Sequence, residues 1–274
     1  MQKQTPEWLT HFITAFGTSG VIALAWWVGA RNASEIRDIQ GSYPFLQVLP
    51  TDHDRLDAND LLSTVSALSG APDAAVISHA KHAPAALNRA LFDDTNLPLV
   101  LTEMGGSGEC FDDWAMLKPM FNNCSWHAIT PSIDARCSGK KSTRGLVFVA
   151  ERGAGPGLAG RTVELAIGLK NLAGAMLLAE QVLRQGPGNR HDMLSLDPTG
   201  WRQMVYRLGG IEQHIHSMTD ELGKALSHRD AKNHAQLICL VHVLVDAFHL
   251  PEDEASRAIR NIYDMAAETV DIPF

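Results

Sequence analysis

The sequence predicts an α/β protein whose parallel-sheet core lies between helical parts at the two ends of the chain. Short apolar runs at Phe45–Leu49, at Leu97–Leu101 and in "GLVFV" (145–149) are typical of strands covered on both faces of a sheet. Amphipathic stretches of helical period separate these runs. From about residue 171 the pattern is helical only, so we expect the helices there to form a part of their own.

The N-terminal part, residues 1–40, is expected to contain two helices. A helix at 5–16 begins with Thr5, a good capping residue, and continues with a proline suited to the first turn. The glycines of "GTSG" (17–20) interrupt the helical pattern. A second helix is then expected to run to about Ile39.

One uncharged stretch, Trp8–Ala30, is long enough to cross a bilayer. Its first half contains several polar side chains and the two glycines of "GTSG", and its strongly apolar part, Val21–Val28, covers only two turns. A pair of buried helices fits this pattern better than a membrane span. We therefore expect no membrane association.

The core, residues 41–170, and the C-terminal part, residues 171–274, follow in a regular order. After the first strand, the apolar runs predict strands at 97–101, 144–153 and 162–169, and a short apolar segment covers 73–80. Helical patterns fall at 58–69, 83–94, 111–121, 171–185, 198–227, 231–248 and 251–268. The clearest linker is "QGPGNRHD", because glycine and proline disfavour the interiors of helices and strands.

Composition argues against several functional classes. The net charge of −8 disfavours broad, charge-driven binding of nucleic acid, which needs clustered lysine and arginine. The four cysteines are widely spaced and no secretory signal pattern is visible, so we expect reduced thiols in a cytoplasmic protein. His79-x-x-His82 and His214-x-His216 lack a second ligand pair, and we expect no metal site.

A local basic run, "ARCSGKKSTRG", is the best candidate for a nucleic-acid contact. Its cations are Arg136, Lys140, Lys141 and Arg144, which could line a single-stranded DNA backbone. Trp126 is the only aromatic residue nearby that could stack on a base. Short charge runs of this kind more often form solvated loops, so weak DNA binding is an alternative here and not the first expectation.

An acidic turn follows the first predicted strand. Strand, turn and helix form the frame in which many proteins hold a phosphate, but the cradle needs glycines and a lysine. The stretch "PTDHDRLDA" (50–58) has neither. A further alternative is metal-dependent chemistry by Asp52, His53, Asp54 and Asp57, because α/β proteins place ligands at the carboxyl ends of strands. Acidic turns on protein surfaces are nevertheless common.

The order of five segments resembles the ATPase module of plasmid and phage primase–helicase replication proteins, in which a Toprim-type primase precedes a P-loop helicase domain. The segments are "LAWWVGARNASEIRDIQGSYPFLQV", "NLPLVLTEMG", "FDDWAMLKPMFNN", "RGLVFVAERG" and "AKNHAQLICLVHVL". The resemblance covers about residues 20–268. It implies a P-loop-NTPase-like core of RecA/AAA+ type, with three layers and a parallel sheet, and no primase part.

The resemblance also assigns a degenerate phosphate loop. In the family, the strand that matches 44–49 leads into a glycine-rich loop with a lysine and a serine or threonine. The corresponding residues here are Pro50, Asp52, Asp54, Leu56 and Asp57, with Leu56 near the expected lysine. The aspartates would repel a triphosphate.

Two further positions match functional residues of the family. Glu103 matches the acidic residue that polarises water or holds magnesium, and Arg161 matches an arginine placed before the last core strand. Such an arginine can reach a neighbouring subunit's site and stabilise the transferring phosphoryl group. The alternative roles are a cap or surface hydrogen bond for Glu103 and a salt bridge to a core carboxylate for Arg161. The position of the γ-phosphate sensor holds Glu151-Arg152, where the family has a polar residue, usually asparagine.

These observations predict a pseudo-ATPase that acts as an accessory or regulatory subunit in the replication or maintenance of a mobile element. Its expected partners are copies of itself, a helicase or another replication protein. We expect no cofactor, since ATP and magnesium need the missing loop, and the only catalytic candidates are the vestigial Glu103 and Arg161. The alternatives are a single-stranded nucleic-acid-binding module without motor activity and an ATPase with an altered nucleotide pocket.

Overall fold

The computed structural model describes residues 4–50, 56–70, 76–78, 87, 90–93, 95–102, 117–122, 141–150, 158–184, 192–223 and 225–269. The chain divides into two compact units, each built from segments that are far apart in the sequence. One unit comprises Met1–Val28, Pro50–Asp73 and Leu165–Phe274, and the other comprises Gly29–Leu49 and Ala74–Glu164.

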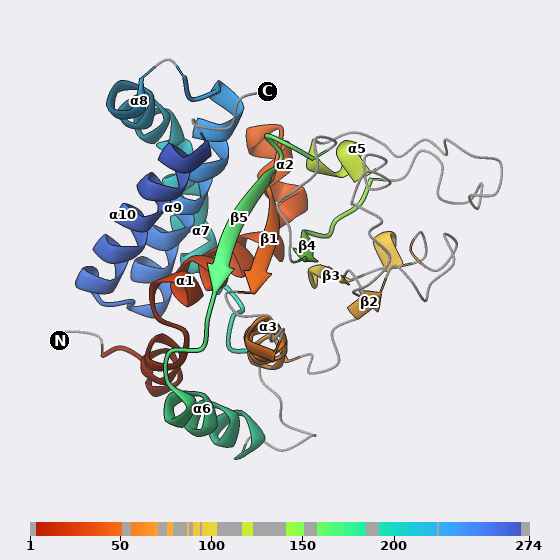
Figure 1. Cartoon of the computed structure of the whole chain (residues 1–274), viewed down its shortest axis with the longest axis vertical. Coiled ribbons are helices and arrows are strands. Elements are labelled where there is room, and N and C mark those ends of the chain that lie inside the picture. Colours follow the sequence, from red (N-terminus) through yellow and green to blue (C-terminus); the bar gives the residue numbers. More distant parts are fainter. Residues whose placement is uncertain are drawn as a thin grey trace. The chain divides into compact units, whose positions relative to one another are not determined.

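Five strands among the described residues form one sheet, in the order β2-β3-β4-β1-β5 (Figure 1). Their bounds are Phe45–Pro50 for β1, Val76–Ser78 for β2, Leu99–Thr102 for β3, Leu146–Val149 for β4 and Thr162–Ile167 for β5. The pairs β2–β3, β3–β4 and β4–β1 are parallel. The register is fixed by pairs such as Val100 with Val147 and Leu46 with Val147.

The four strands expected from apolar runs are therefore confirmed as β1, β3, β4 and β5. The short apolar segment at 73–80 contributes an additional strand, β2, at the edge of the sheet. Every residue of β4 is buried, as its continuous apolar sequence requires. In the sheet, β1 lies between β4 and β5. The chain continues from β1 to β2 on one side and later from β4 to β5 on the other, so the direction of the connections reverses at β1 and β4. Such reversal points are where open α/β sheets bind ligands.

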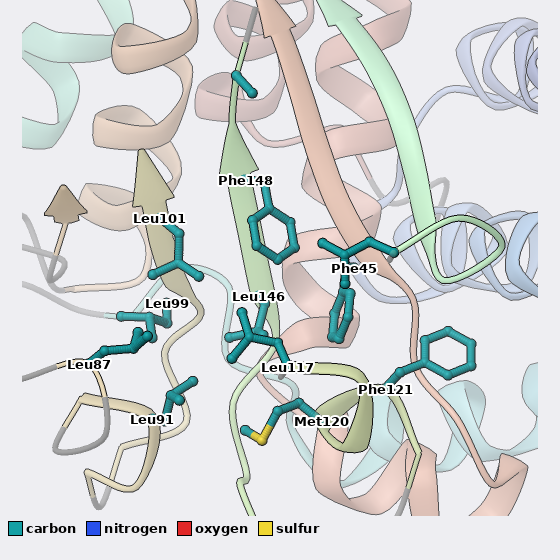
Figure 2. Close-up of a cluster of buried hydrophobic side chains, with 12 residues drawn as sticks. Phe45, Leu87, Leu91, Leu99, Leu101, Leu117, Met120, Phe121, Leu146 and Phe148 are labelled. Carbon is teal, nitrogen blue, oxygen red and sulfur yellow. The ribbon is translucent and has the colours of Figure 1, made fainter. Parts of the chain in front are cut away.

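An apolar core packs on one face of β1, β3 and β4 within the second unit. Figure 2 shows Phe148 of β4 and Phe45 of β1 lying edge to face, with ring centroids 5.7 Å apart. On its other side Phe45 meets Phe121 of the short helix α5 (Lys118–Phe121), at 6.0 Å. The same cluster contains Leu87, Leu91, Leu99, Leu101, Leu117, Met120, Leu146, Ala150 and Leu158.

The N-terminal helix α1 (Glu7–Ala30) is broken where the sequence predicts a break. Gly17 has φ 60° and ψ −151°, a backbone conformation that residues other than glycine rarely adopt. A Cβ there would also lie 2.8 Å from the Lys170 side chain. The expected continuation to Ile39 is wrong, because the chain turns at residues 31–32 before α2 (Ala33–Gln40) begins.

Helix α1 passes the length and composition criteria for a membrane span, and it is the one helix among the described residues that does. Most of its apolar window is buried inside the protein. Trp26 and Trp27 are almost fully buried, and the Trp27 indole N–H donates to Ser69 Oγ at 2.9 Å. A helix that buries its tryptophans in this way matches the core helix of a folded domain.

The first unit also contains α3 (Leu56–Leu68) and a helical tail made of α6 (Leu172–Arg184), α7 (Pro198–Gly209), α8 (Ile211–Leu222), α9 (His228–Phe248) and α10 (Glu252–Glu268). The helices α7, α8 and α10 all pack against α9, which is the most buried helix of the tail (Figure 1). The single helix expected at 198–227 is in fact two helices. The adjacent glycines Gly209 and Gly210 stand at the junction, and glycine is a poor helix former.

Candidate functional site

The acidic turn predicted from the sequence is flanked by a strand and a helix, as expected. The strand ends at Pro50 and α3 begins at Leu56, so residues 51–55 connect them. Asp57 is the second residue of α3. Asp52, Asp54 and Glu103 lie outside the described residues, and so do the alternative ligand His53 and the sensor position 151–152.

The residues in this frame differ in chemistry from a phosphate loop. A phosphate loop presents glycine N–H groups and a lysine to the ligand at a helix N-terminus. The connection from 51 to 55 contains no glycine and no lysine, and it contains two aspartates. An aspartate early in α3 suits the positive end of the helix dipole, the same end that would otherwise attract a phosphate.

Arg161 lies in the turn that leads into β5, and its backbone is fixed at both polar groups. Its N–H donates to Leu158 O at 2.9 Å, and its carbonyl accepts the Phe45 N–H at 2.9 Å. The guanidinium carbon lies 6.0 Å from the centroid of the Phe121 ring, at the outer limit of a cation–π contact. Arg161 is partly exposed. The backbone bonds fix the residue in the second unit, and its guanidinium lies near the Phe121 ring of the apolar core.

The position of Arg161 along β1 limits which phosphate site it could serve. Its carbonyl bonds to Phe45, the first residue of the strand, whereas the acidic turn follows the last residue, Pro50. A strand rises by about 3.3 Å per residue, so roughly 16 Å separate the two ends of β1. Arg161 is thus at the amino end of the strand and not beside its carboxyl end.

The structure contradicts the predicted nucleic-acid contact at Arg144. This side chain is only 2% exposed. Its guanidinium donates to three carbonyl oxygens: Ala90 O at 2.6 Å, Leu97 O at 2.7 Å and Pro98 O at 3.2 Å. Burial lowers the pKa of Arg144, and the nearby Asp93 partly offsets this effect. Arg144 ties the segments before β3 and β4 together, so it cannot face a DNA strand.

A second buried arginine, missed by the sequence reasoning, completes this network. Arg37 of α2 donates to Arg144 O at 2.8 Å and to Ser142 O at 3.1 Å. Ser142 in turn donates its hydroxyl to Leu91 O at 2.8 Å. Burial lowers the pKa of Arg37 to about 10, so it remains charged at neutral pH. Arg37 follows Ile36 in "SEIRDIQ" and shares the buried face of α2 with Ala33 and Ile36, and this spacing was the signal in the sequence.

The other basic candidates divide between the described and undescribed parts of the chain. Lys141 is exposed. Arg136 and Lys140 lie outside the described residues, as do Trp126 and the histidines 79 and 82. Within the described residues no group of three or more His, Cys, Asp or Glu side chains could hold a metal ion.

Comparison with known proteins gives a match among solved structures. No protein-family profile matches the sequence, and no curated protein matches it. Among solved structures, the chain is similar to one described as "SCCmec type IV Cch - active helicase", with a TM-score of 0.69 and 14% sequence identity. The match covers 96% of this chain and 50% of that chain, so this protein spans about half of the helicase's length.

This likeness concerns the fold. The TM-score over nearly the whole chain and the parallel sheet together confirm the expected P-loop-NTPase-like α/β fold. At 14% identity the match says nothing about which residues act. The helicase-like fold is therefore established for this chain, and its activity has to be argued from its own residues.

Proposed function

We propose that the chain is a catalytically degenerate helicase-type ATPase that serves as an accessory or regulatory subunit in the replication or maintenance of a mobile DNA element. It assembles with itself or with an active helicase and does not turn over ATP. Its helicase-like fold supports the first half of this proposal. The resemblance of its segments to plasmid and phage replication proteins supports the second half.

The connection between β1 and α3 is the observation that carries the proposal. β1 ends at Pro50 and α3 begins at Leu56, which is the strand–turn–helix order of a phosphate site, but the residues between them in the sequence include neither glycine nor lysine. Phosphoryl transfer depends almost entirely on positioning and charge stabilisation. Removing the groups that perform both leaves little for catalysis.

The place of Arg161 supports a role in assembly. It stands at the amino end of β1, away from its own degenerate loop, and Phe45 and Phe121 hold it there. A positioned guanidinium supplied to another subunit's nucleotide can accelerate hydrolysis by several orders of magnitude. A chain that has lost its own site can still offer this group to an active partner.

We expect the purified chain to raise the ATPase rate of the helicase encoded on the same DNA element. The Arg161→Ala variant should raise that rate by a factor at least ten times smaller than the natural chain does. The ATPase rate of the helicase would be measured with and without the chain, and co-elution on size exclusion would report the assembly. Arg202→Ala, at an exposed arginine of α7, is the matched control and should leave the rate unchanged. An unchanged helicase rate together with no co-elution would remove the proposal.

Single-stranded nucleic-acid binding is the weaker reading. It depended on four cations, and one of them, Arg144, is buried and bonded to carbonyls. Lys141 is the remaining cation among the described residues of that run. No contact in the described part of the chain favours this reading over the accessory subunit.

A further inference from the structure

A polar cluster occupies the place where α7 and α8 pack against α9 in the helical tail. The rings of His214 on α8 and His242 on α9 are stacked, with centroids 5.8 Å apart and planes inclined by 23°. Beside them Arg207 of α7 donates Nε to Asp246 Oδ2 at 2.8 Å and Nη2 to Asp246 Oδ1 at 3.1 Å. The stacked rings therefore join α8 to α9, and the ion pair joins α7 to α9.

This cluster disfavours a positive charge on either ring. Burial lowers the pKa of His214 and of His242 from the ordinary value of 6.5, and the Arg207 cation acts in the same direction. Across the stack, His214 also lowers the pKa of His242. Asp246 acts in the opposite sense on His242, but both of its oxygens accept hydrogen bonds from Arg207. The folded junction therefore holds two neutral rings.

The other titratable groups on the packed helices leave this balance unchanged. Burial raises the pKa of the Cys239 thiol on α9 to about 12, so it stays neutral. On α10, Tyr263 interacts with Ser217 and Glu221 of α8. Within the described part of the tail, Arg207 and Asp246 are thus the charged side chains that act on the two rings.

We propose that the stacked His214–His242 pair makes the packing of α8 on α9 sensitive to pH, so that α8 is held at neutral pH and loosens in mild acid. The sign follows from linkage. A histidine whose pKa is lowered by folding stabilises the folded junction above the unfolded value of 6.5, and this contribution is lost as the pH falls through the lowered folded value. The packing of α7 is held by its ion pair and needs no neutral histidine.

Amide hydrogen exchange on the full chain tests this proposal. Between about pH 7.5 and about pH 5.5, after correction for the intrinsic exchange rate, we expect opening of α8 to become several-fold more frequent, with a smaller change in α7. The double variant His214→Gln/His242→Gln should lose this pH difference. His216→Gln is the matched control, because His216 is an exposed histidine on the same helix, and it should keep the difference.

Equal protection of α8 at both pH values in the natural chain would overturn the proposal, and so would a pH difference that survives in the double variant. If the double variant does not fold, an NMR titration of the ring protons in the natural chain decides the question. Two rings that titrate below 6.5, together with shifts of α8 amides over the same pH range, support the proposal. Rings that titrate at or above 6.5 contradict it.

Discussion

Replacing Arg144 by alanine is expected to lower the free energy of unfolding by roughly 3–5 kcal/mol, because three carbonyl oxygens lose a charged donor. Arg144 is 2% exposed, so the alanine variant takes a buried guanidinium donor from the carbonyls of Ala90, Leu97 and Pro98. Urea unfolding followed by circular dichroism would measure the loss. Arg144→Lys should recover only part of the stability, because an ammonium group lacks the planar fork that reaches three oxygens.

The matched control is Lys141→Ala, three residues away. Lys141 is an exposed cation of the same run, and its replacement should change the free energy of unfolding by no more than about 0.5 kcal/mol. A loss below about 1 kcal/mol for Arg144→Ala would mean that Arg144 does not tie these segments together. The basic run would then regain its interpretation as a solvated surface.

Phe148→Ala is the second substitution with a large expected effect, a loss of roughly 3–5 kcal/mol. Phe148 is 1% exposed at the centre of β4 and meets Phe45 edge to face at 5.7 Å. Its removal leaves a cavity in the core of the second unit (Figure 2), because the neighbouring strands fix the surrounding side chains. Thermal and urea unfolding of the variant would measure the effect.

Two further variants separate cavity formation from loss of apolar surface alone. Phe148→Leu retains much of the side-chain volume, so its free energy of unfolding should fall by only about 1–3 kcal/mol, less than that of Phe148→Ala. Leu172→Ala, at a leucine of α6 that is 64% exposed, should change stability by no more than about 0.5 kcal/mol. Equal losses for Phe148→Ala and Phe148→Leu would show that the ring does not fill this core as described.

The fold was largely predictable because its strands are short and continuously apolar. The continuous apolar runs that form β1, β3 and β4 predict strands that are buried on both faces. Gly17 predicts the break in α1. The turn after α1 was missed because Arg31 and Asn32 carry no glycine or proline signal. The two helices α7 and α8 were merged because the helical pattern continues on both sides of the glycine pair at 209–210.

The site was less predictable, for a physical reason. A basic run is usually solvated, and nothing in the sequence says that carbonyl oxygens of distant segments will surround one of its arginines. Arg144 and Arg37 became buried because the unpaired carbonyls near them need donors. The ion pair between Arg207 and Asp246 could not be predicted from the sequence either, because the two residues are 39 positions apart and meet only when α7 packs on α9. The resemblance located Arg161, and only the hydrogen bond to Phe45 placed it at the amino end of β1.

The most direct test of the central claim is calorimetric titration of the purified chain with ATP and with ADP in the presence of magnesium. The absent glycines and lysine predict no detectable heat of binding for this chain at millimolar nucleotide. Micromolar binding would contradict the account, and it would return Glu103 and Arg161 to the position of catalytic candidates.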